Sequence, residues 1–590
     1  MSTRAFHRGS TESGCVYPRV FGARGAIVAE NYLAADAGLD VLKAGYNAVD
    51  AVVAASWVEG LVDPHMFTPG GEVPMLIKMI GQRTQVINGN TAAPAAATPE
   101  AYTQRGLERV PDNGILAAGV PAAPGALITA LLRFGTSSFE EVVEAALHHA
   151  RHGFPLHAGI LEQERYGVRD CAAHFLKEWP ASAQLYLPGG EAPTLPRMFK
   201  NAAYAQLLEY LIAAERTASG SRTTKLGAVY RAFYQGEPSA AIERFSRARD
   251  GLLARSDLEG FATHVEDPAV LQFRGSEVYK CGPWNQGPVL LQALGILDTV
   301  DLQALGHNSA DYIHYVTEAM NLAFADREQY YGDPRQVKVP LEGLLSRQYA
   351  KARAALIDPR HACAELRPGN PSTGVALLPE SDRLGGRSWG AGTVHVSAID
   401  KAGNMAAATP SGAWLRSNEV VAELGFPLGN RLMTFHLAPE RHPNVVAPLK
   451  RPRTTISPTL VTREKEEPWL VFGSMGGDQQ DQWQLQFFLN RAVFGLNLQA
   501  AIEAPKFSSE HFPASFGASE RVPRRLRIEP MESSVFEALR AKGHELDVAA
   551  RWSEGFLLAI EAHRDSGLLE AACDPRGSKT SIFAPATRVF

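Results

Sequence analysis

Small and branched apolar residues recur at helical spacing between positions 32 and 62, and Gly45-Tyr46-Asn47 interrupts them. The pattern predicts two helices, of which Gly45 ends the first and Asn47 caps the second. The same spacing predicts a mainly helical region from residue 99 to about 274, and further helices over 289–297 and 310–325.

After position 393 the pattern changes to the two-residue period of strands. Residues 393–399 alternate between apolar and polar side chains, which predicts a half-buried strand. A tight turn at 400–404 and a returning strand over 405–409 follow. Apolar runs at 459–461, 469–472 and 556–560 predict interior strands, and 574–577 is typical of a turn. The core face of the first strand would carry Val394, Val396 and Ala398, and its other face Thr393, His395 and Ser397.

Composition excludes several classes of function. The 590-residue chain has 45% apolar and 21% charged residues, which is ordinary for a globular protein with a sizeable core. A net charge of −5 provides no basic surface, so no nucleic-acid partner is expected. No apolar run suits a signal peptide or a membrane span. The five cysteines are scattered, and no metal or phosphate motif is present. We therefore expect a cytoplasmic protein without a metal or organic cofactor.

One candidate for catalysis stands at the start of the predicted strand. Gly392 precedes Thr393, and a hydroxyl residue after a flexible glycine suits a chain that cuts itself there. Thr393 would become a new N-terminus with its own α-amine as base. The upstream segment 359–392 is rich in Pro, Gly and Ser up to residue 387, and we expect it to be exposed, as cleavage requires. The same residues also fit an ordinary hairpin bounded by glycine.

A second candidate follows the apolar strand at 469–472. Gly476 and Gly477 stand between this strand and a helix expected from about residue 481. Glycine lets backbone N–H groups approach a reacting carbonyl, so this stretch is a candidate oxyanion cradle as well as a simple turn. His65, in a loop, could act as a ligand or a base, or have neither role.

These pieces, in this order, resemble the γ-glutamyltransferase family of N-terminal-nucleophile hydrolases over nearly the whole chain. The matching stretches are 33–54 (with Gly45 to Ala51), 318–334, 393–404, 450–458, 473–477 and Asp574-Pro575-Arg576. The resemblance implies an α+β fold, a four-layer αββα sandwich made as one precursor. It implies cleavage between Gly392 and Thr393 into a large segment, 1–392, and a small one, 393–590.

The resemblance also implies roles for single residues. Thr393 Oγ would attack the Gly392 carbonyl during maturation and the substrate acyl carbon during turnover. Gly476 and Gly477 would supply the oxyanion hole. Ser411 aligns with a family Thr that supports the nucleophile, and Thr409 is a second candidate on the same strand.

Departures from the family lie at the positions that hold a γ-glutamyl head group. Two opposite charges of the family pattern are missing, and each charge-assisted contact contributes about 1.5–3 kcal/mol. Arg431, with Arg416 or Arg453 nearby, could hold a carboxylate instead, or these arginines could be solvated. The family's carboxylate-binding Arg falls on Asn90, its Ser pair on Thr454-Thr455, its Asp on Thr434, its Gln on Arg431 and its Asn on Ala413.

We therefore predict an autoprocessing threonine hydrolase that cleaves the amide (C–N) bond of a small carboxylic-acid substrate through an acyl-enzyme. The alternatives are a γ-glutamyltransferase or glutathione hydrolase with an altered head-group site, a C–C bond hydrolase of a biosynthetic pathway, and an uncleaved, inactive scaffold. The expected partners are a small-molecule substrate and the two subunits of one precursor, which could pair into a larger dimer. No nucleic acid and no membrane are expected.

Overall fold

Two seven-stranded antiparallel sheets lie face to face in the computed structural model, which describes residues 15–379, 383–385, 392–579 and 583–590. The first sheet has the order β21-β2-β10-β11-β3-β4-β7 and the second β1-β20-β19-β15-β14-β9-β8. The first consists of β21 (Ala586–Val589), β2 (Gly25–Ala29), β10 (Val396–Asp400), β11 (Met405–Ala408), β3 (Met75–Lys78), β4 (Gln85–Asn88) and β7 (His264–Glu266). The second consists of β1 (Val20–Gly22), β20 (Leu569–Cys573), β19 (Leu557–Ala562), β15 (Glu467–Ser474), β14 (Thr459–Arg463), β9 (Ser276–Lys280) and β8 (Ala269–Phe273).

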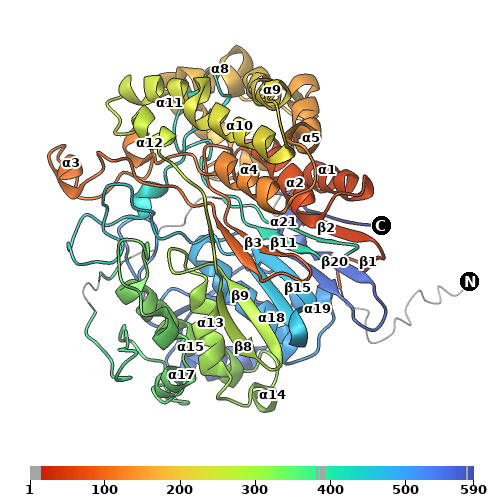
Figure 1. The fold of residues 1–590 in the computed structure, drawn as a ribbon. Helices are drawn as coiled ribbons and strands as arrows, with labels where there is room; N and C mark the ends of the chain where they lie inside the picture. Colours follow the sequence, from red (N-terminus) through yellow and green to blue (C-terminus); the bar gives the residue numbers. More distant parts are fainter. Residues whose placement is uncertain (1–14, 380–382, 386–391, 580–582) are drawn as a thin grey trace, which may run out of the picture.

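Helices cover the outer face of each sheet, so the molecule has four layers (Figure 1). The predicted αββα sandwich is confirmed. Side chains from both sheets, such as Val28, Ile399, Val471 and Ile560, form the core between them. Over the first sheet lie α1 (Tyr32–Lys43), α2 (Ala48–Val62), α4 (Ala123–Phe134), α5 (Phe139–His152), α9 (Ala202–Thr217) and α10 (Arg222–Gln235). Over the second lie α13 (Pro288–Leu297), α15 (Ala310–Tyr330), α17 (Arg347–Ala354), α18 (Gln480–Ala492) and α19 (Leu498–Glu503).

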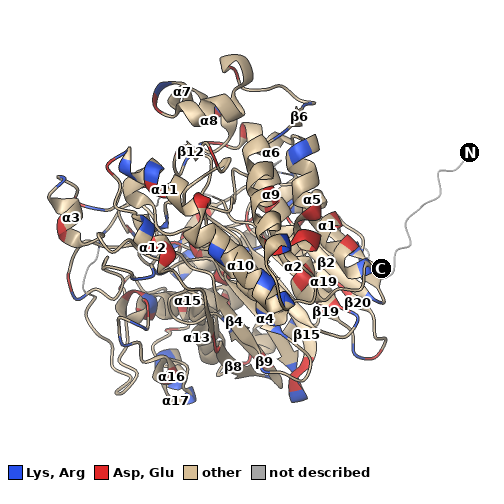
Figure 2. Ribbon diagram, turned by 45° about the horizontal axis from the view of Figure 1, so that its top comes forward, with Lys and Arg blue, Asp and Glu red and all other residues tan. Residues whose placement is uncertain are grey.

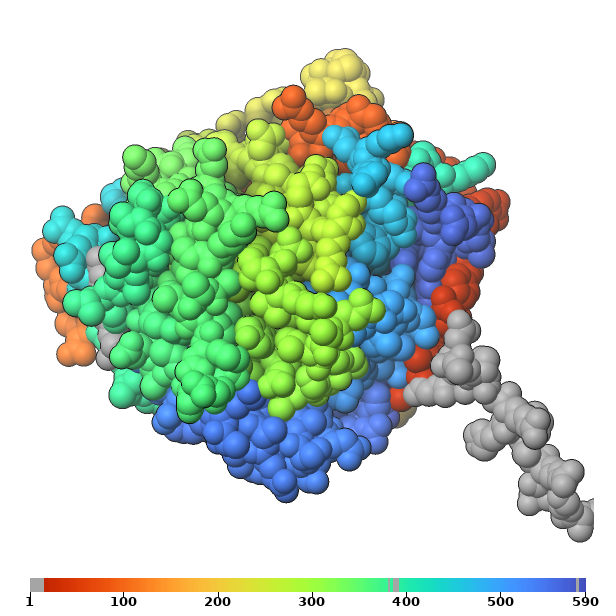
Figure 3. Space-filling view, turned by 90° about the horizontal axis from the view of Figure 1, so that it is seen from below, coloured from red at the N-terminus to blue at the C-terminus, as the bar shows by residue number. Residues whose placement is uncertain are grey.

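The chain on both sides of position 393 builds each layer of strands. Strands β2, β3, β4 and β7 precede this position, and they share one sheet with β10, β11 and β21, which follow it. The second sheet likewise combines β1, β8 and β9, which precede position 393, with β14, β15, β19 and β20, which follow it. Figure 3 shows segments from both parts of the chain side by side on one face of the molecule. Separation of the two parts would therefore disrupt both sheets.

The helix α2 begins as the sequence predicts. Asn47 caps it, accepting hydrogen bonds from the Val49 and Asp50 amides, while Asp50 accepts one from the Asn47 amide. Gly45, after α1, has a φ of +95°, a conformation that favours glycine. Because every residue of α2 is buried, this helix fixes the position of the loop that begins at Asp63.

Three expectations about the elements are corrected. Strand β10 is buried on both faces, since the second sheet covers the side that was expected to be polar and exposed. Helix α15 continues beyond the expected end at 325 to Tyr330, because the polar residues Asp326 and Arg327 are buried and bonded to other segments. The turn expected at 574–577 is the start of a short helix, α21 (Pro575–Lys579).

The surface agrees with the even charge balance of the sequence. Figure 2 shows Lys and Arg interspersed with Asp and Glu on the outer helices. In the described part of the chain no helix is long and apolar enough to cross a membrane.

Of the expected exposed segment 359–392, residues 380–382 and 386–391 lie outside the described residues. Leu366 in this segment is buried, and the Gly369 amide donates to Asp326 at 2.7 Å.

Candidate active site

Thr393 lies just before strand β10 and is 2% exposed. It pairs in antiparallel fashion with Ser411, which follows β11, and their hydroxyl oxygens are 3.0 Å apart. The backbone of Ser411 in turn exchanges two hydrogen bonds of 2.9 Å with Glu72. Thr393 is therefore held in the sheet by its backbone, with its hydroxyl directed to a second hydroxyl.

The carbonyl of Gly392 receives two hydrogen bonds. Ser411 Oγ donates to it at 3.2 Å and the indole Nε1 of Trp414 at 2.6 Å. Gly392 also packs tightly on the loop after α2, where a Cβ would lie 1.7 Å from Met66 Sδ and 2.9 Å from Met66 Cα. Only glycine fits at this position, and the peptide bond that follows it is polarised by two donors.

Arg431 connects this pair of hydroxyls to a buried carboxylate. Its Nη2 donates to Ser411 Oγ at 2.9 Å and its Nε to Glu72 Oε1 at 2.9 Å. Arg431 is 2% and Glu72 1% exposed. Burial raises the pKa of the Glu72 carboxyl, and the Arg431 guanidinium opposes that shift. Because a guanidinium only donates, Ser411 Oγ accepts this bond and directs its own proton to Gly392 or Thr393.

The alternative that these arginines are solvated is wrong for two of the three. Arg431 is buried, and Arg453 is 3% exposed and pairs with Glu328 at 2.8 Å. Arg416 is exposed and donates to the Arg165 carbonyl at 3.3 Å. A cation in a sequence is expected at the surface, and here paired carboxylates keep two of them inside.

Gly476 and Gly477 lie between β15 and α18 with φ of +119° and +57°. A Cβ on Gly476 would lie 2.4 Å from Trp483 and one on Gly477 3.0 Å from Phe516. Neither amide N–H has an acceptor among the residues that the structure describes. Two adjacent N–H groups without a described acceptor make this stretch a candidate anion site.

Two contacts connect these glycines to the nucleophile candidate. Gly473, at the end of β15, packs on His395, since a Cβ there would lie 2.2 Å from Nδ1. Phe516, beside Gly477, has its ring 5.9 Å from the guanidinium of Arg431. The strand that leads to the glycine pair therefore packs on His395, and the ring beside Gly477 packs near Arg431.

Thr409 is close to the site but does not contact Thr393. Its hydroxyl is 3.1 Å from His395 Nδ1, and His395 Nε2 is 2.6 Å from Ser397 Oγ. Burial and the nearby Lys280 lower the pKa of His395 to about 3, so this imidazole is neutral between two hydroxyls. These contacts give Thr409 a role in orienting β10 rather than contact with the reacting peptide.

The four remaining candidates lie on segments that hydrogen bonds join to this site. The Thr434 hydroxyl donates to the Arg431 carbonyl at 3.0 Å, and Asn444 bridges the Thr434 carbonyl and the Arg453 amide at 2.7 and 2.8 Å. Gln286 joins the Thr454 carbonyl, at 2.9 Å, to the Gly477 carbonyl, at 3.2 Å. Asn90 Nδ2 donates to the Pro452 carbonyl at 2.6 Å, and Thr455 is buried next to Thr454.

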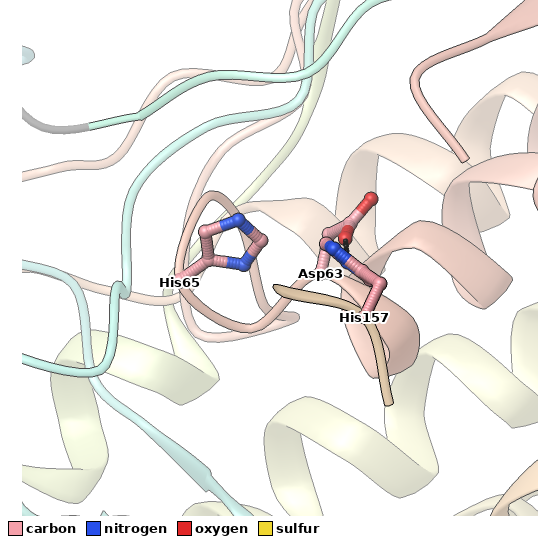
Figure 4. Close-up of side chains that lie close together, drawn as sticks. All are labelled: Asp63, His65 and His157. Atoms are coloured by element: carbon pink, nitrogen blue, oxygen red, sulfur yellow. Dashed lines mark hydrogen bonds and ion pairs between the residues drawn. The ribbon is translucent and has the colours of Figure 1, made fainter. Parts of the chain in front are cut away.

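His65 lies beside the site in a cluster with Asp63 and His157 (Figure 4). Their ligand atoms lie within 4.8 Å of one another, which suits a metal. However, His157 Nδ1 accepts a hydrogen bond from the Gly159 amide at 3.2 Å, so its proton is on Nε2, 2.5 Å from Asp63 Oδ1. A protonated Nε2 has no lone pair for a metal. We therefore interpret this cluster as a hydrogen-bonded Asp–His pair.

Three contributors to the site were not found from the sequence. Trp414 is only three residues after Ser411, but two left-handed residues, Gly412 and Ala413, turn the chain between them. Glu72 and Met66 act through contacts with residues more than 300 positions away. The signals available in the sequence were Glu72 directly after Gly70-Gly71 and Trp414 directly after Ser411-Gly412-Ala413.

The fold and the site define the class of the protein. Two facing antiparallel sheets between helices, with a buried threonine at the entry to a central strand and a free pair of glycine amides beside it, are the arrangement of an N-terminal-nucleophile amide hydrolase.

Comparison with known proteins gives the family. The model of the γ-glutamyltranspeptidase family matches residues 34–584. A glutathione hydrolase proenzyme of Escherichia coli (strain K12) is 30% identical, over 95% of this chain and 92% of that protein. The Acylase ACY 1 proenzyme of Pseudomonas sp. (strain V22) is 31% identical, over 94% of this chain and 92% of that protein. The chain belongs to the γ-glutamyltranspeptidase family, whose members cleave themselves as proenzymes and hydrolyse amides.

Solved structures agree with this assignment. The structure of LmbA2991T421A is 37% identical with a TM-score of 0.90, over 98% of this chain and 100% of that chain. The cephalosporin acylase from Bacillus halodurans is 26% identical with a TM-score of 0.83, over 100% of this chain and 99% of that chain. The likeness thus extends over the whole sandwich.

Proposed function

We propose that the chain cuts itself between Gly392 and Thr393, and that Thr393 is then the nucleophile of an amidohydrolase. The hydrogen bonds around this one peptide carry the proposal: Gly392 O has two donors, and Thr393 Oγ1 has a hydroxyl partner in Ser411. Cleavage frees the Thr393 α-amine, whose ordinary pKa of about 7.7–8.0 suits a general base at neutral pH. Gly476 and Gly477 then stabilise the oxyanion of the substrate.

The two products, residues 1–392 and 393–590, stay together as a heterodimer in this proposal. Both parts contribute strands to both sheets, and most of the buried core is shared between them. We place the enzyme in the reducing cytoplasm, because all five cysteines are free, including the buried Cys171, Cys281 and Cys573.

The substrate we propose is an amide of a small carboxylic acid other than a standard γ-glutamyl group. Asn90 and Thr434 offer an amide and a hydroxyl where the family pattern has charges, and Thr454 and Thr455 keep hydroxyls where it has a Ser pair. The charge of Arg431 is balanced by Glu72 at 2.9 Å. Asn90 Oδ1 is buried without a donor among the described residues, and it remains available to a substrate N–H or hydroxyl. The acylases among the relatives support this class.

Intact mass and N-terminal sequencing of the purified protein, beside Thr393→Ala, test the cleavage. We expect fragments of roughly 42 and 21 kDa from the 63.8 kDa wild-type chain, the smaller beginning at Thr393, and one uncleaved chain for the variant. A wild-type chain that stays intact would contradict the proposal and favour a scaffold. A small fragment that begins elsewhere would exclude Thr393 as the nucleophile.

Turnover of γ-glutamyl-p-nitroanilide against a panel of simple acyl amides tests the substrate class. We expect faster turnover of the acyl amides. Preference for the γ-glutamyl compound would favour a glutathione hydrolase or γ-glutamyltransferase with an altered head-group site, and no amide turnover by a cleaved enzyme would favour C–C bond cleavage.

A further inference from the structure

Trp414 is the closer of the two hydrogen-bond donors to the carbonyl that must be attacked if the chain cuts itself. Its Nε1 lies 2.6 Å from Gly392 O, against 3.2 Å for Ser411 Oγ. The side chain is 2% exposed, so water does not compete for this bond. Nothing in the sequence pattern assigns Trp414 a function.

The backbone around Trp414 directs the indole toward Gly392. Gly412 and Ala413 have φ of +81° and +54°, which reverses the chain directly after Ser411. A left-handed conformation at an alanine costs of order 1 kcal/mol, so the surrounding structure must enforce it. The Thr68 hydroxyl donates to the Ala413 carbonyl at 2.9 Å, and Ser417 donates through its amide and its hydroxyl to the Trp414 carbonyl at 2.8 and 2.7 Å.

Packing fixes the orientation of the indole ring, and a nearby cation strengthens its N–H as a donor. Trp414 packs with Met433 and Phe516, and the ring of Tyr166 lies 6.4 Å away, edge to face. The guanidinium of Arg431 lies 5.5 Å from the ring centre. A cation near an aromatic ring is attracted by its electron density and polarises it, which makes the N–H more positive.

We propose that Trp414 is the principal oxyanion donor of self-cleavage, a site distinct from the Gly476–Gly477 pair that serves turnover. This inference rests on cleavage at Gly392–Thr393. Thr393 Oγ1 bonds to the Gly392 carbon and closes a five-membered ring, while the carbonyl electron pair moves to the Gly392 oxygen. The Trp414 N–H and the Ser411 hydroxyl stabilise that negative charge, and Trp414 keeps its proton throughout.

The remaining steps break the peptide bond and restore the Thr393 hydroxyl. The oxygen electron pair re-forms the carbonyl as the C–N bond breaks, and the proton lost by Thr393 Oγ1 reaches the leaving nitrogen, which becomes the α-amine. Water then hydrolyses the ester between Gly392 and Thr393 Oγ1. The products are a Gly392 carboxylate and a free Thr393 hydroxyl.

The test measures the rate at which refolded precursor converts into the two fragments, by mass spectrometry over time. Trp414→Phe should slow cleavage about 100- to 1000-fold, the usual effect of removing one oxyanion donor. Trp469→Phe is the matched control: it also removes a buried indole N–H, which donates to Glu561 at 3.1 Å on another part of the fold. This control should cleave close to the wild-type rate.

A second replacement separates the lost donor from lost packing. Incorporation of 3-benzothienylalanine at position 414 keeps the shape of the indole but replaces N–H by sulfur. Slowing of about 100- to 1000-fold, with an unchanged melting temperature, supports the proposal even if Trp414→Phe folds poorly. Cleavage of the benzothienyl protein at the wild-type rate overturns it.

The control experiments distinguish this inference from the proposed function. If the wild-type small fragment begins at Thr393 and the benzothienyl protein cleaves normally, only the role of Trp414 is wrong. If the wild-type fragment begins at another residue, or no fragment forms, the cleavage proposal fails first, and the role of Trp414 fails with it.

Discussion

The buried pair Arg431–Glu72 should be strongly coupled to stability, and each single neutralisation should be costly. At 2.9 Å and an effective dielectric constant of about 20, the attraction between the two charges is about 6 kcal/mol. Removal of one partner leaves the other buried and uncompensated, a loss of about 3–5 kcal/mol. The variants are Glu72→Gln, Arg431→Gln and the double variant, all in a Thr393→Ala background that keeps the precursor uncleaved.

Urea denaturation followed by tryptophan fluorescence gives the free energy of unfolding of each variant. We expect the double variant to be more stable than the sum of the single losses predicts, by at least about 2 kcal/mol. Additive losses would refute the claim that the two charges compensate each other. A second outcome would also contradict it: near-neutral single substitutions, which would mean that the charges are solvated.

The two single variants should differ in pH dependence. Burial raises the pKa of Glu72 above 4.5, and removal of Arg431 takes away the group that opposes the rise. A carboxyl with a raised folded-state pKa contributes stability below its unfolded pKa and loses it as pH rises through the folded value. The loss in Arg431→Gln should therefore shrink toward pH 4. The loss in Glu72→Gln should not shrink there, because arginine does not titrate in this range and the variant lacks the carboxyl whose raised pKa stabilises wild type at low pH.

Three further predictions follow from buried groups. Burial raises the pKa of Glu554 to about 7. As the pH rises from 4.5 to 7.5, wild type should therefore lose up to about 3 kcal/mol of unfolding free energy relative to Glu554→Gln. Parallel curves of unfolding free energy against pH would contradict this. Gly392→Ala should abolish or strongly slow self-cleavage, because the added methyl group meets Met66. Adding Met66→Ala to this variant should restore cleavage only in part, since the Met66 backbone still crowds the methyl group. Full rescue would show that only the Met66 side chain matters. Asp50→Ala removes the acceptor of five described N–H or O–H groups and should lower the melting temperature more than a surface Asp→Ala does, with a normal melting curve as the contrary result.

The architecture was largely predictable because its signals are local. The interruption Gly45-Tyr46-Asn47 contains both the residue that ends one helix and the residue that caps the next, and both act within four positions. The hairpin of β10 and β11 is equally local, since Gly403 with a φ of +89° makes its turn. The order of the motifs then identified the sandwich.

The burial of the polar face of β10 was not predictable from the alternation itself. A two-residue period shows that a strand has two kinds of face, but not that a second sheet covers the polar one. His395 and Ser397 lie on that covered face and satisfy each other and Thr409. A family resemblance implies two sheets, but only the packing of Gly473 on His395 shows which polar side chains lie between them.

Arg431 was predicted as a site residue, but the sequence left open whether it was buried or solvated. Its partner Glu72 is 359 positions away, and nothing local to either residue signals the pair. The same holds for Trp414, whose approach to Gly392 depends on the left-handed conformation of Ala413, a residue that does not favour it. Roles that need long-range contacts or strained backbone leave no periodic trace in a sequence.

The departures from the γ-glutamyl pattern form one physical unit. A cation at position 431 would be untenable in a buried site without an anion, and Glu72 supplies that anion through the strand segment that pairs with Ser411. With its charge balanced by Glu72, Arg431 donates a hydrogen bond to Ser411 Oγ, and its guanidinium lies 5.5 Å from the ring centre of Trp414. The residue at one of the positions that the resemblance assigns to head-group binding thus contacts both groups that donate to the Gly392 carbonyl. Under the proposed cleavage at Gly392–Thr393, variants of Arg431 should therefore alter maturation before they alter substrate choice.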